Sequence, residues 1–336
     1  MSGSATSSDG GSVVCVGESM ILVVPEAGSL EHDERFLASV AGAESNVACG
    51  LAHLGVGAAW LSRVGADPFG ERLVRFVTSR GVDAGGVVRD GRHPTGVFFK
   101  HREAAATRVY YYRRGSAAAH LSRADLATIR TTDADLVHVT GVSLGVSPAL
   151  ADTVRGVILD RTLGRARVSF DVNYRAGLWT VAEAASPLLE ASQGADVVLV
   201  GQDEAETLWG ATTPEQVRAL IDRPGHLVVK DGSRGATHVG PHGVSVEPAM
   251  RATVVEAVGA GDAFAAGFLA GLARGEPSEV CLRLGHVMAA LTLQDSVDLP
   301  ALPAAAWIWR LARDRDRFLA TEVTPDLLAP GTTPEN

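Results

Sequence analysis

Four short runs of apolar residues dominate the middle of the chain, and amphipathic stretches of helical character separate them. The runs cover residues 136–140, 168–172, 197–200 and 227–230. Their apolarity is continuous rather than alternating, which is typical of strands that are covered on both faces. The pattern predicts an α/β fold with a mostly parallel central sheet flanked by helices. Ligands of such sheets bind beyond the carboxyl ends of the strands.

The pattern on either side of this block predicts the rest of the fold. The expected elements are strands at 13–17 and 60–64, a turn and helix over 41–55, a helix over 71–80, a brief strand at 87–88, and helical segments at 277–293 and 304–320. Short apolar segments near 21–24 and 36–40, and β-rich runs at 95–101 and 108–113, predict small strands and a hairpin. We expect these strands, within about 18–40 and 94–114, to form a small β lid over a binding site.

Length and composition favour one domain. The chain has 336 residues, of which 46% are hydrophobic and 21% charged, as in ordinary globular proteins. Residues 1–12 are mostly small and polar, so we expect them to be disordered. A single domain is expected over 13–320, followed by a loose C-terminal tail over 321–336, which is rich in Pro and Thr.

Charge and cysteine usage exclude several classes of partner. The formal charge is −9, and no block of Lys and Arg offers a footprint for nucleic acid. No apolar run is long enough to span a bilayer, and the N-terminus lacks a signal pattern, so we expect a cytoplasmic protein without membrane contact. The three cysteines lie far apart among apolar or small residues, which indicates buried, reduced thiols.

The stretch 256–264, Glu-Ala-Val-Gly-Ala-Gly-Asp-Ala-Phe, has the character of a tight turn that opens a helix. Gly259 and Gly261 have no Cβ, so a ligand can approach the backbone amides closely. The first amides of a helix have no intrahelical partner, and they favour an anion such as phosphate. Asp262 lies within this group of donors, where it can take a proton from an attacking hydroxyl. A lone Gly-rich turn of this kind more often simply ends a strand, with the Asp, here Asp262, as a helix cap.

This stretch resembles the C-terminal signature of the ribokinase-like carbohydrate kinases (the PfkB family), Asp-Thr-x-Gly-Ala-Gly-Asp-x-Phe. The resemblance implies a ribokinase-like fold and transfer of a phosphoryl group from ATP, with Mg²⁺, to a sugar hydroxyl. It makes Asp262 the base, with Gly259, Ala260 and Gly261 as the anion hole. Glu256 and Ala257 replace the usual Asp and Thr. The family binds a monovalent cation near there, so these two changes count against a K⁺ site.

Three further segments resemble the branch of this family that handles 2-keto-3-deoxygluconate (KDG). Residues 41–48 are similar to its Gly-Gly-Ala-Glu-x-Asn-Val-Ala motif, which implies that Gly42 and Asn46 lie near the sugar; an N-cap is the alternative for Asn46. Residues 171–179 are similar to Asp-x-Asn-x-Arg-x-x-Leu-Trp, in which the Arg, here Arg175, meets the substrate. A guanidinium group fits the carboxylate of a sugar acid, although a surface ion pair would also explain an arginine there.

The third segment, 110–117, resembles the Tyr-Tyr-Arg-x-x-Ser-Ala run of the same branch. In a strand Tyr111 and Arg113 share one face, so both can point at one ligand, whereas packing is the alternative for the aromatic residues. Phe98 stands where some relatives have a substrate-binding Tyr. The missing hydroxyl leaves the choice of sugar open.

Two segments of the chain fit nucleotide use. Residues 201–204 resemble the Asn-x-x-Glu motif of the family, with Gly201 in place of Asn, and imply that Glu204 holds Mg²⁺ through water. A solvated acid at a helix start is the alternative. The Lys-x-Gly-x-x-Gly loop of the family is matched at 230–235, which implies ATP contacts from Lys230, Gly232, Ser233 and Gly235.

The resemblance covers about residues 13–295, with the motifs in the order of the family. Together these observations predict an ATP-dependent kinase that phosphorylates the terminal hydroxyl of a sugar acid such as KDG. The alternatives are a kinase for a neutral sugar, such as fructose or ribose, and a non-catalytic protein that binds sugar or nucleotide. A nucleoside or vitamin-precursor kinase would need a more aromatic pocket than the 5% aromatic content favours. A homo-oligomer is also open, since relatives often pair through their β lids.

Overall fold

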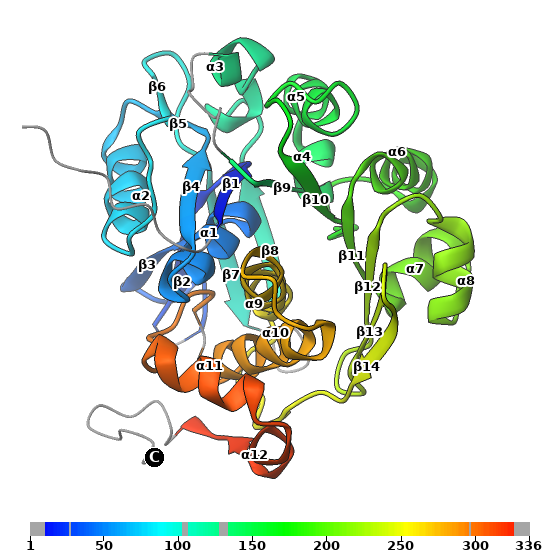
Figure 1. Cartoon of the computed structure of the whole chain (residues 1–336). Helices are drawn as coiled ribbons and strands as arrows, with labels where there is room; N and C mark the ends of the chain where they lie inside the picture. The colour runs from blue at the N-terminus through cyan, green and yellow to red at the C-terminus, as the bar shows by residue number, and fades with distance from the viewer. Residues whose placement is uncertain (1–10, 27, 103–106, 128–133, 296, 326–336) are drawn as a thin grey trace, which may run out of the picture.

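The computed structural model describes residues 11–26, 28–102, 107–127, 134–295 and 297–325, and it has an eight-stranded central sheet (Figure 1). Its strands, in spatial order, are β14 (Gly243–Glu247), β13 (Ala236–Gly240), β12 (His226–Lys230), β11 (Val197–Gly201), β10 (Arg167–Asp171), β9 (Leu136–Thr140), β1 (Ser12–Val16) and β4 (Gly57–Leu61). The six strands from β12 to β4 run parallel to one another. β13 pairs antiparallel with β12, and β14 pairs antiparallel with β13. The expected mostly parallel sheet is therefore confirmed.

Helices cover both faces of this sheet (Figure 1). One face carries α1 (Ala43–His53), α2 (Pro68–Thr78), α9 (Ala260–Ala273), α10 (Ser278–Thr292) and α11 (Ala305–Arg313). The other carries α3 (Arg123–Ala127), α4 (Gly141–Val146), α5 (Pro148–Ile158), α6 (Val181–Gly194), α7 (Gln202–Trp209) and α8 (Pro214–Leu220). In β11, Val197 and Leu199 pack on the first layer while Val198 and Val200 pack on the second, and all four are fully buried. This two-sided burial explains the continuous apolarity of the strand.

A second, four-stranded sheet forms the predicted lid. Its order is β3 (Phe36–Ala41), β2 (Met20–Pro25), β7 (Val97–Arg102) and β8 (Thr107–Tyr112). β7 and β8 pair antiparallel, as the hairpin prediction requires, and β2 pairs with β3 antiparallel and with β7 parallel.

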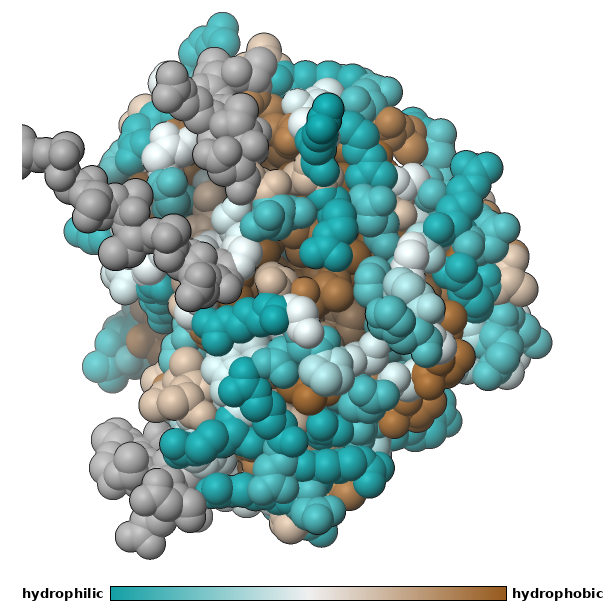
Figure 2. All heavy atoms as spheres, in the orientation of Figure 1, coloured by the Kyte–Doolittle hydropathy of each residue, from teal (hydrophilic) through white to brown (hydrophobic). Residues whose placement is uncertain are grey.

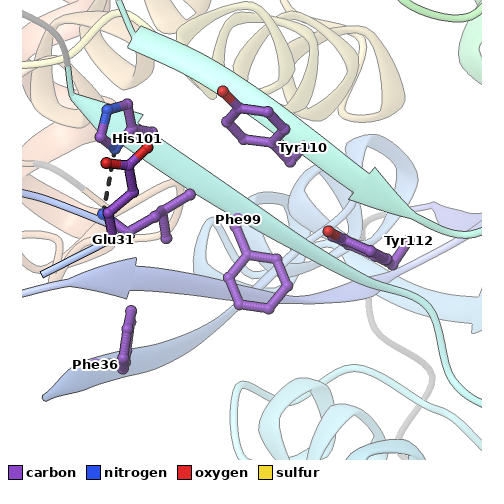
Figure 3. Close-up of a pocket in the computed structure, with 7 residues that line it drawn as sticks. Glu31, Phe36, Phe99, His101, Tyr110 and Tyr112 are labelled. Carbon is purple, nitrogen blue, oxygen red and sulfur yellow. Dashed lines mark hydrogen bonds between the residues drawn. The ribbon is translucent and has the colours of Figure 1, made fainter. Parts of the chain in front are cut away.

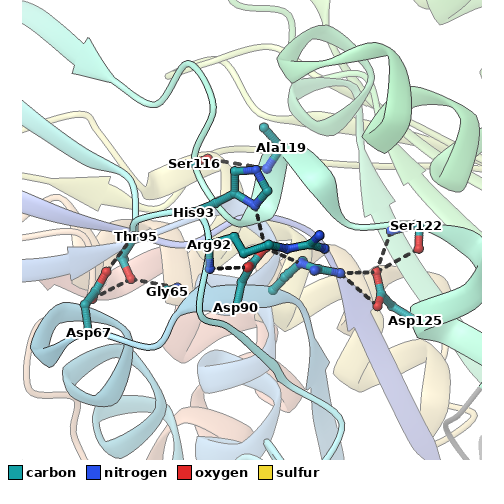
Figure 4. A network of polar contacts seen from close by, with 11 residues as sticks. Gly65, Asp67, Asp90, Arg92, His93, Thr95, Ser116, Ala119, Ser122 and Asp125 are labelled. Atoms are coloured by element: carbon teal, nitrogen blue, oxygen red, sulfur yellow. Dashed lines mark hydrogen bonds and ion pairs between the residues drawn. The ribbon is translucent and has the colours of Figure 1, made fainter.

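The entry of the chain into β7 is held by a polar network (Figure 4). Thr95 donates its backbone N–H and its hydroxyl to Asp67 at 2.8 and 2.9 Å, and Gly65 donates its N–H to the Thr95 hydroxyl. Nearby, Arg63 bridges Asp90 and Asp125. These bonds tie the base of the lid to the body of the protein.

Several boundaries differ from the expected ones. The strand expected at 60–64 is split into β4 and β5 (Arg63–Gly65), because β5 leaves the central sheet to pair with β6 (Val88–Asp90). The helix expected from 71 begins at Pro68, since Asp67 caps it by accepting the N–H of Gly70 at 2.8 Å. The segment 304–320 is two helices, α11 and α12 (Arg315–Ala320), because Asp314 interrupts the first helix and caps the second.

The chain ends are more ordered than expected where the structure describes them. Ser12 already belongs to β1, and β16 (Glu322–Val323) pairs with β15 (Arg251–Ala252). The loose tail predicted from residue 321 is therefore wrong for 321–323, because Val323 is buried in this pairing. The remaining terminal residues, 1–10 and 326–336, lie outside the described residues.

The distribution of polar and apolar residues over the surface, and the burial of the cysteines, agree with what the composition predicts. The face in Figure 2 is mainly hydrophilic, with hydrophobic residues between the hydrophilic ones. Across the described part of the chain, no helix has both the length and the apolarity that crossing a membrane requires. Cys15, Cys49 and Cys281 are free and buried, as predicted.

Candidate active site

A cavity of about 910 Å³ lies between the lid and the carboxyl ends of the central strands. The lid contributes Phe98, Lys100, Tyr111 and Arg113 to its wall. The body contributes the ends of β11 and β12, the residues that follow β10, the start of α1 and the start of α9. The cavity thus lies where a parallel sheet places its ligands.

The Gly-rich turn opens α9 on this wall, as predicted. Gly259 is the N-cap with φ +87°, a left-handed conformation that favours glycine. A Cβ there would also lie 3.1 Å from the backbone of Asp298. Gly259 and Gly261 line the cavity, so the first-turn amides, which have no partner within the helix, lie at its edge; the Ala260 N–H donates to the Ala257 carbonyl at 3.4 Å. Since no side chain caps this helix, the alternative role of Asp262 as a cap is wrong.

Asp262 is held by two amides from distant segments. It is 7% exposed, and its carboxylate accepts the Asn46 Nδ2 at 2.9 Å and the Asn173 Nδ2 at 3.2 Å. Burial raises the pKa of Asp262, and the bond from Asn46 and the charge of Arg175 counteract part of this effect, which leaves the pKa at about 6. At neutral pH the carboxylate is therefore mostly ionised, yet basic enough to accept a proton.

The two asparagines also offer acceptors of their own. The Oδ1 atoms of Asn46 and Asn173 are buried and have no hydrogen-bond partner among the residues that the structure describes. Asn46 lies in the first turn of α1, whose N-cap is Gly42, so the N-cap alternative for Asn46 is wrong. Asn173 has φ 38°, a left-handed conformation that directs its amide to Asp262. A polyol could donate hydroxyls to both oxygens.

We expect the pH profile of activity to show the ionisation of Asp262. kcat/KM should fall on the acid side with an apparent pKa near 6, because protonated Asp262 cannot take a proton from the acceptor. The measurement is the initial rate at limiting substrate from pH 4.5 to 8.5. A profile that stays flat down to pH 5 would contradict the prediction.

Lys230 and Arg175 supply positive charge from the body. Lys230 Nζ donates to both oxygens of Asp171, at 2.8 and 3.0 Å, and lies 3.9 Å from where a Cβ of Gly261 would be. Burial acts to lower the pKa of Lys230, but the charges of Asp171 and Glu204 outweigh it and raise that pKa. Arg175 is exposed at the cavity and makes no ion pair within the described residues, so the alternative of a surface ion pair is wrong.

The lid face shows the alternation that the sequence predicts. Tyr111 lines the cavity and stacks on Phe98, with ring centroids 5.6 Å apart. Arg113 also lines the cavity, but its guanidinium is already ion-paired with Glu18, which the Ser116 hydroxyl also contacts at 2.7 Å. Tyr110 and Tyr112 instead line a separate hollow of about 370 Å³ on the other face of the lid (Figure 3).

The nucleotide residues that the sequence predicts are only partly brought together. Lys230 and Gly232 line the cavity, whereas Ser233 and Gly235 of the same loop do not. Glu204 lines it, but its carboxylate accepts the backbone N–H groups of Gly201 at 2.7 Å and Tyr174 at 2.8 Å. Burial raises the pKa of Glu204, while the charge of Lys230 opposes this shift.

Gly42 lines the cavity for a reason that the motif does not reveal. A Cβ on Gly42 would lie 2.5 Å from the carbonyl oxygen of Glu18. The glycine is therefore needed for packing between α1 and the β1–β2 connection, besides any approach of a sugar.

Sequence analysis missed several charged residues at or near the cavity, among them Glu18, Glu44, Lys100, Asp203 and Asp298. Glu18 lies two residues after the end of β1, so the rule that ligands bind beyond the carboxyl ends of parallel strands could have found it. Glu44 is buried beside Asn46 and accepts the hydroxyls of Thr140 and Ser143 at 2.7 Å; burial raises its pKa to about 7. Lys100 shares the strand face of Phe98, whereas no sequence signal marks Asp298.

Comparisons with known proteins agree with this geometry. The family model described as "pfkB family carbohydrate kinase" matches residues 11–305. The chain is 34% identical to 2-dehydro-3-deoxygluconokinase (KDG kinase) of Bacillus subtilis, over 86% of this chain and 92% of that protein. It is 30% identical to fructokinase-1 of rice, Oryza sativa, over 89% of this chain and 97% of that protein.

A solved structure shares the fold. It is an uncharacterized sugar kinase from Pyrococcus horikoshii in complex with ATP, at 25% identity and a TM-score of 0.77. The match covers 92% of this chain and 100% of that one. The chain belongs to the pfkB family of carbohydrate kinases and has its ribokinase-like fold, so it is a phosphotransferase with an alcohol group as acceptor.

Proposed function

We propose that this kinase transfers the γ-phosphoryl group of ATP to the terminal hydroxyl of KDG or a similar sugar acid, with Asp262 as the base. The observation that carries the proposal is the buried Asp262, which faces the cavity at the start of α9 between two asparagine amides. The similarity to the Bacillus KDG kinase and the ATP complex of the Pyrococcus relative support the choice of substrates.

The chain supplies each part of the transfer that a kinase needs from its protein. Asp262 takes the proton of the attacking hydroxyl, while the free Oδ1 atoms of Asn46 and Asn173 accept hydroxyls of the sugar and orient it. The amides of Gly259, Ala260 and Gly261 bind the phosphoryl oxygens, and the ammonium of Lys230 adds positive charge beside them.

A divalent cation such as Mg²⁺ would neutralise phosphate charge when it is bound. The cavity fits a cation held mainly by the nucleotide and water, because the described residues contain no cluster of three or more potential metal-ligating side chains. Both carboxylate oxygens of Glu204 already accept backbone N–H groups, so Glu204 would contact the water molecules around the cation rather than the cation itself.

Among the described residues that line the cavity, one cationic side chain is not already paired with a carboxylate and can bind the substrate carboxylate. Arg113 faces the cavity as expected, but Glu18 already pairs with it. Arg175 is exposed at the cavity and has no carboxylate partner among the described ion pairs. We therefore assign binding of the substrate carboxylate to Arg175. Tyr111 and Phe98 form the wall beside it.

The test is ADP release from ATP and Mg²⁺ with KDG, gluconate, fructose and ribose as acceptors. We expect the highest kcat/KM with KDG. Preference for fructose or ribose would overturn the sugar-acid assignment and leave the kinase assignment in place.

A neutral-sugar kinase is the second candidate, because Glu18 and Asp298 already neutralise Arg113 and Lys100 in the lid. Arg175→Leu distinguishes the two. If Arg175 binds a carboxylate, its loss should raise KM for KDG by about 10- to 100-fold, the equivalent of a charged hydrogen bond of about 1.5–3 kcal/mol. KM for a neutral sugar should change little.

Arg165→Leu is the matched control, since Arg165 is exposed and precedes the amino end of β10, whereas Arg175 follows its carboxyl end. An equal rise of KM for acid and neutral acceptors in Arg175→Leu would contradict the assignment of Arg175.

A further inference from the structure

A buried ion pair joins the lid to the segment between α10 and α11 that packs against the turn at Gly259. Lys100 of β7 places its Nζ 3.1 Å from Asp298 Oδ1, and the two residues are only 3% and 6% exposed. They are 198 residues apart in sequence. Because an unpaired charge is costly at such a depth, each residue depends on the other.

Asp298 lies close to the proposed catalytic base. Its backbone contacts Gly259, where a Cβ would lie 3.1 Å from the Asp298 Cα, and it lines the same cavity as Asp262. The negative charge of Asp298 raises the pKa of Asp262. An Asp298 without a counter-charge would therefore oppose ionisation of Asp262 more strongly.

The other charges around the cavity do not replace Lys100 in this role. Asp171 is paired with Lys230, and Glu18 with Arg113. Two buried carboxyl groups, Glu44 and Glu204, lie in the same region; burial raises the pKa of both, and their ionised forms add negative charge rather than oppose it. The remaining charged residues of the wall are Asp203 and Arg175. Among the ion pairs of the described residues, Asp298 has Lys100 alone as its partner.

We propose that Lys100 is a positioning residue of the lid, which neutralises Asp298 and thereby keeps Asp262 in the ionised form that accepts the hydroxyl proton. This inference rests on the proposed role of Asp262 as base. Because Lys100 belongs to the lid and Asp298 to the body, the lid contributes charge balance to the base as well as a wall to the cavity.

The experiment compares the acid limb of kcat/KM against pH in four variants. Lys100→Met should raise the apparent pKa of the acid limb by about one pH unit, because the negative charge of Asp298 is then no longer compensated. Lys100→Arg keeps the charge and should restore the wild-type limb. Asp298→Asn should move the limb downward, and the double variant Lys100→Met/Asp298→Asn should lie close to the wild type.

An unshifted limb in Lys100→Met, or a double variant that behaves like Lys100→Met, would overturn the proposal. A merely structural role of the pair would lower the rate or stability without moving the limb. If a variant turns over too slowly, the carboxyl ¹³C shift of Asp262 can be titrated directly, with the resonance assigned by its absence in Asp262→Asn.

This direct titration separates the two proposals. If the resonance shifts as expected but Asp262→Asn keeps its activity, the proposed base is wrong, while the electrostatic link between Lys100 and Asp262 stands. If Asp262→Asn is inactive but the resonance does not respond to Lys100→Met, the inference about Lys100 is wrong.

Discussion

Replacing Asp262 with Asn should reduce turnover by about 10²- to 10⁴-fold, the usual contribution of a general base, while the protein stays folded. The amide has the same shape as the carboxylate but cannot take the proton of the attacking hydroxyl. Steady-state kcat with the best acceptor, measured at pH 8, where wild-type Asp262 is ionised, is the direct readout.

Stability should change little in this variant. Because the pKa of Asp262 is raised to about 6, folding favours its protonated form, and the ionised form costs stability at all pH values above about 6. A neutral Asn removes that cost but has one acceptor oxygen instead of two, so one flanking asparagine amide must turn its own oxygen toward the new N–H. The melting temperature at pH 8 should therefore stay close to that of the wild type.

Asp152→Asn is a matched control, because Asp152 forms an exposed ion pair with Arg123 and is not among the residues that line the cavity. Its activity should equal that of the wild type. Near-normal turnover of Asp262→Asn would remove Asp262 from the mechanism.

Replacing Lys230 with Met should lower the free energy of unfolding by about 3 kcal/mol, the low end of what is typical when one partner of a buried ion pair is removed, because the Lys230 side chain is 18% exposed and that of Asp171 only 2%. Asp171 is only 1% exposed and would lose both bonds from the ammonium group. The charge of Glu204 also acts on Lys230, so without the ammonium group the region where phosphate must bind would carry uncompensated negative charge. Urea denaturation at pH 7 measures the stability, and the same samples should show a large loss of kcat.

Two further variants separate burial from charge loss. Lys230→Met/Asp171→Leu removes both charges and should recover much of the stability but not the activity. Arg123→Met removes an exposed arginine that pairs with Asp152 and Asp160, and its unfolding midpoint should hardly change. An equal effect of Lys230→Met and Arg123→Met would show that the Lys230 pair is not stabilised by its burial.

The sequence by itself determined the scaffold. β11 is buried on both faces, so its residues are apolar throughout. Such a continuous apolar run can be recognised in the sequence without knowing which strands lie beside it. The turn at Gly259 is equally local, because a left-handed residue followed by a helix start needs glycine at one position. The alternation of Tyr111 and Arg113 with Tyr110 and Tyr112 follows from the period of a strand.

Only the tertiary structure decided how the charges are paired. Asn46 and Asp262 are 216 residues apart, and Lys100 and Asp298 are 198 apart, so no spacing in the chain could connect them. Arg113 matched a substrate motif, but it meets Glu18 because the lid folds over the end of β1. A side chain's type indicates what it can bind, whereas the fold determines which partner reaches it first in a buried cavity, where an unpaired charge is costly.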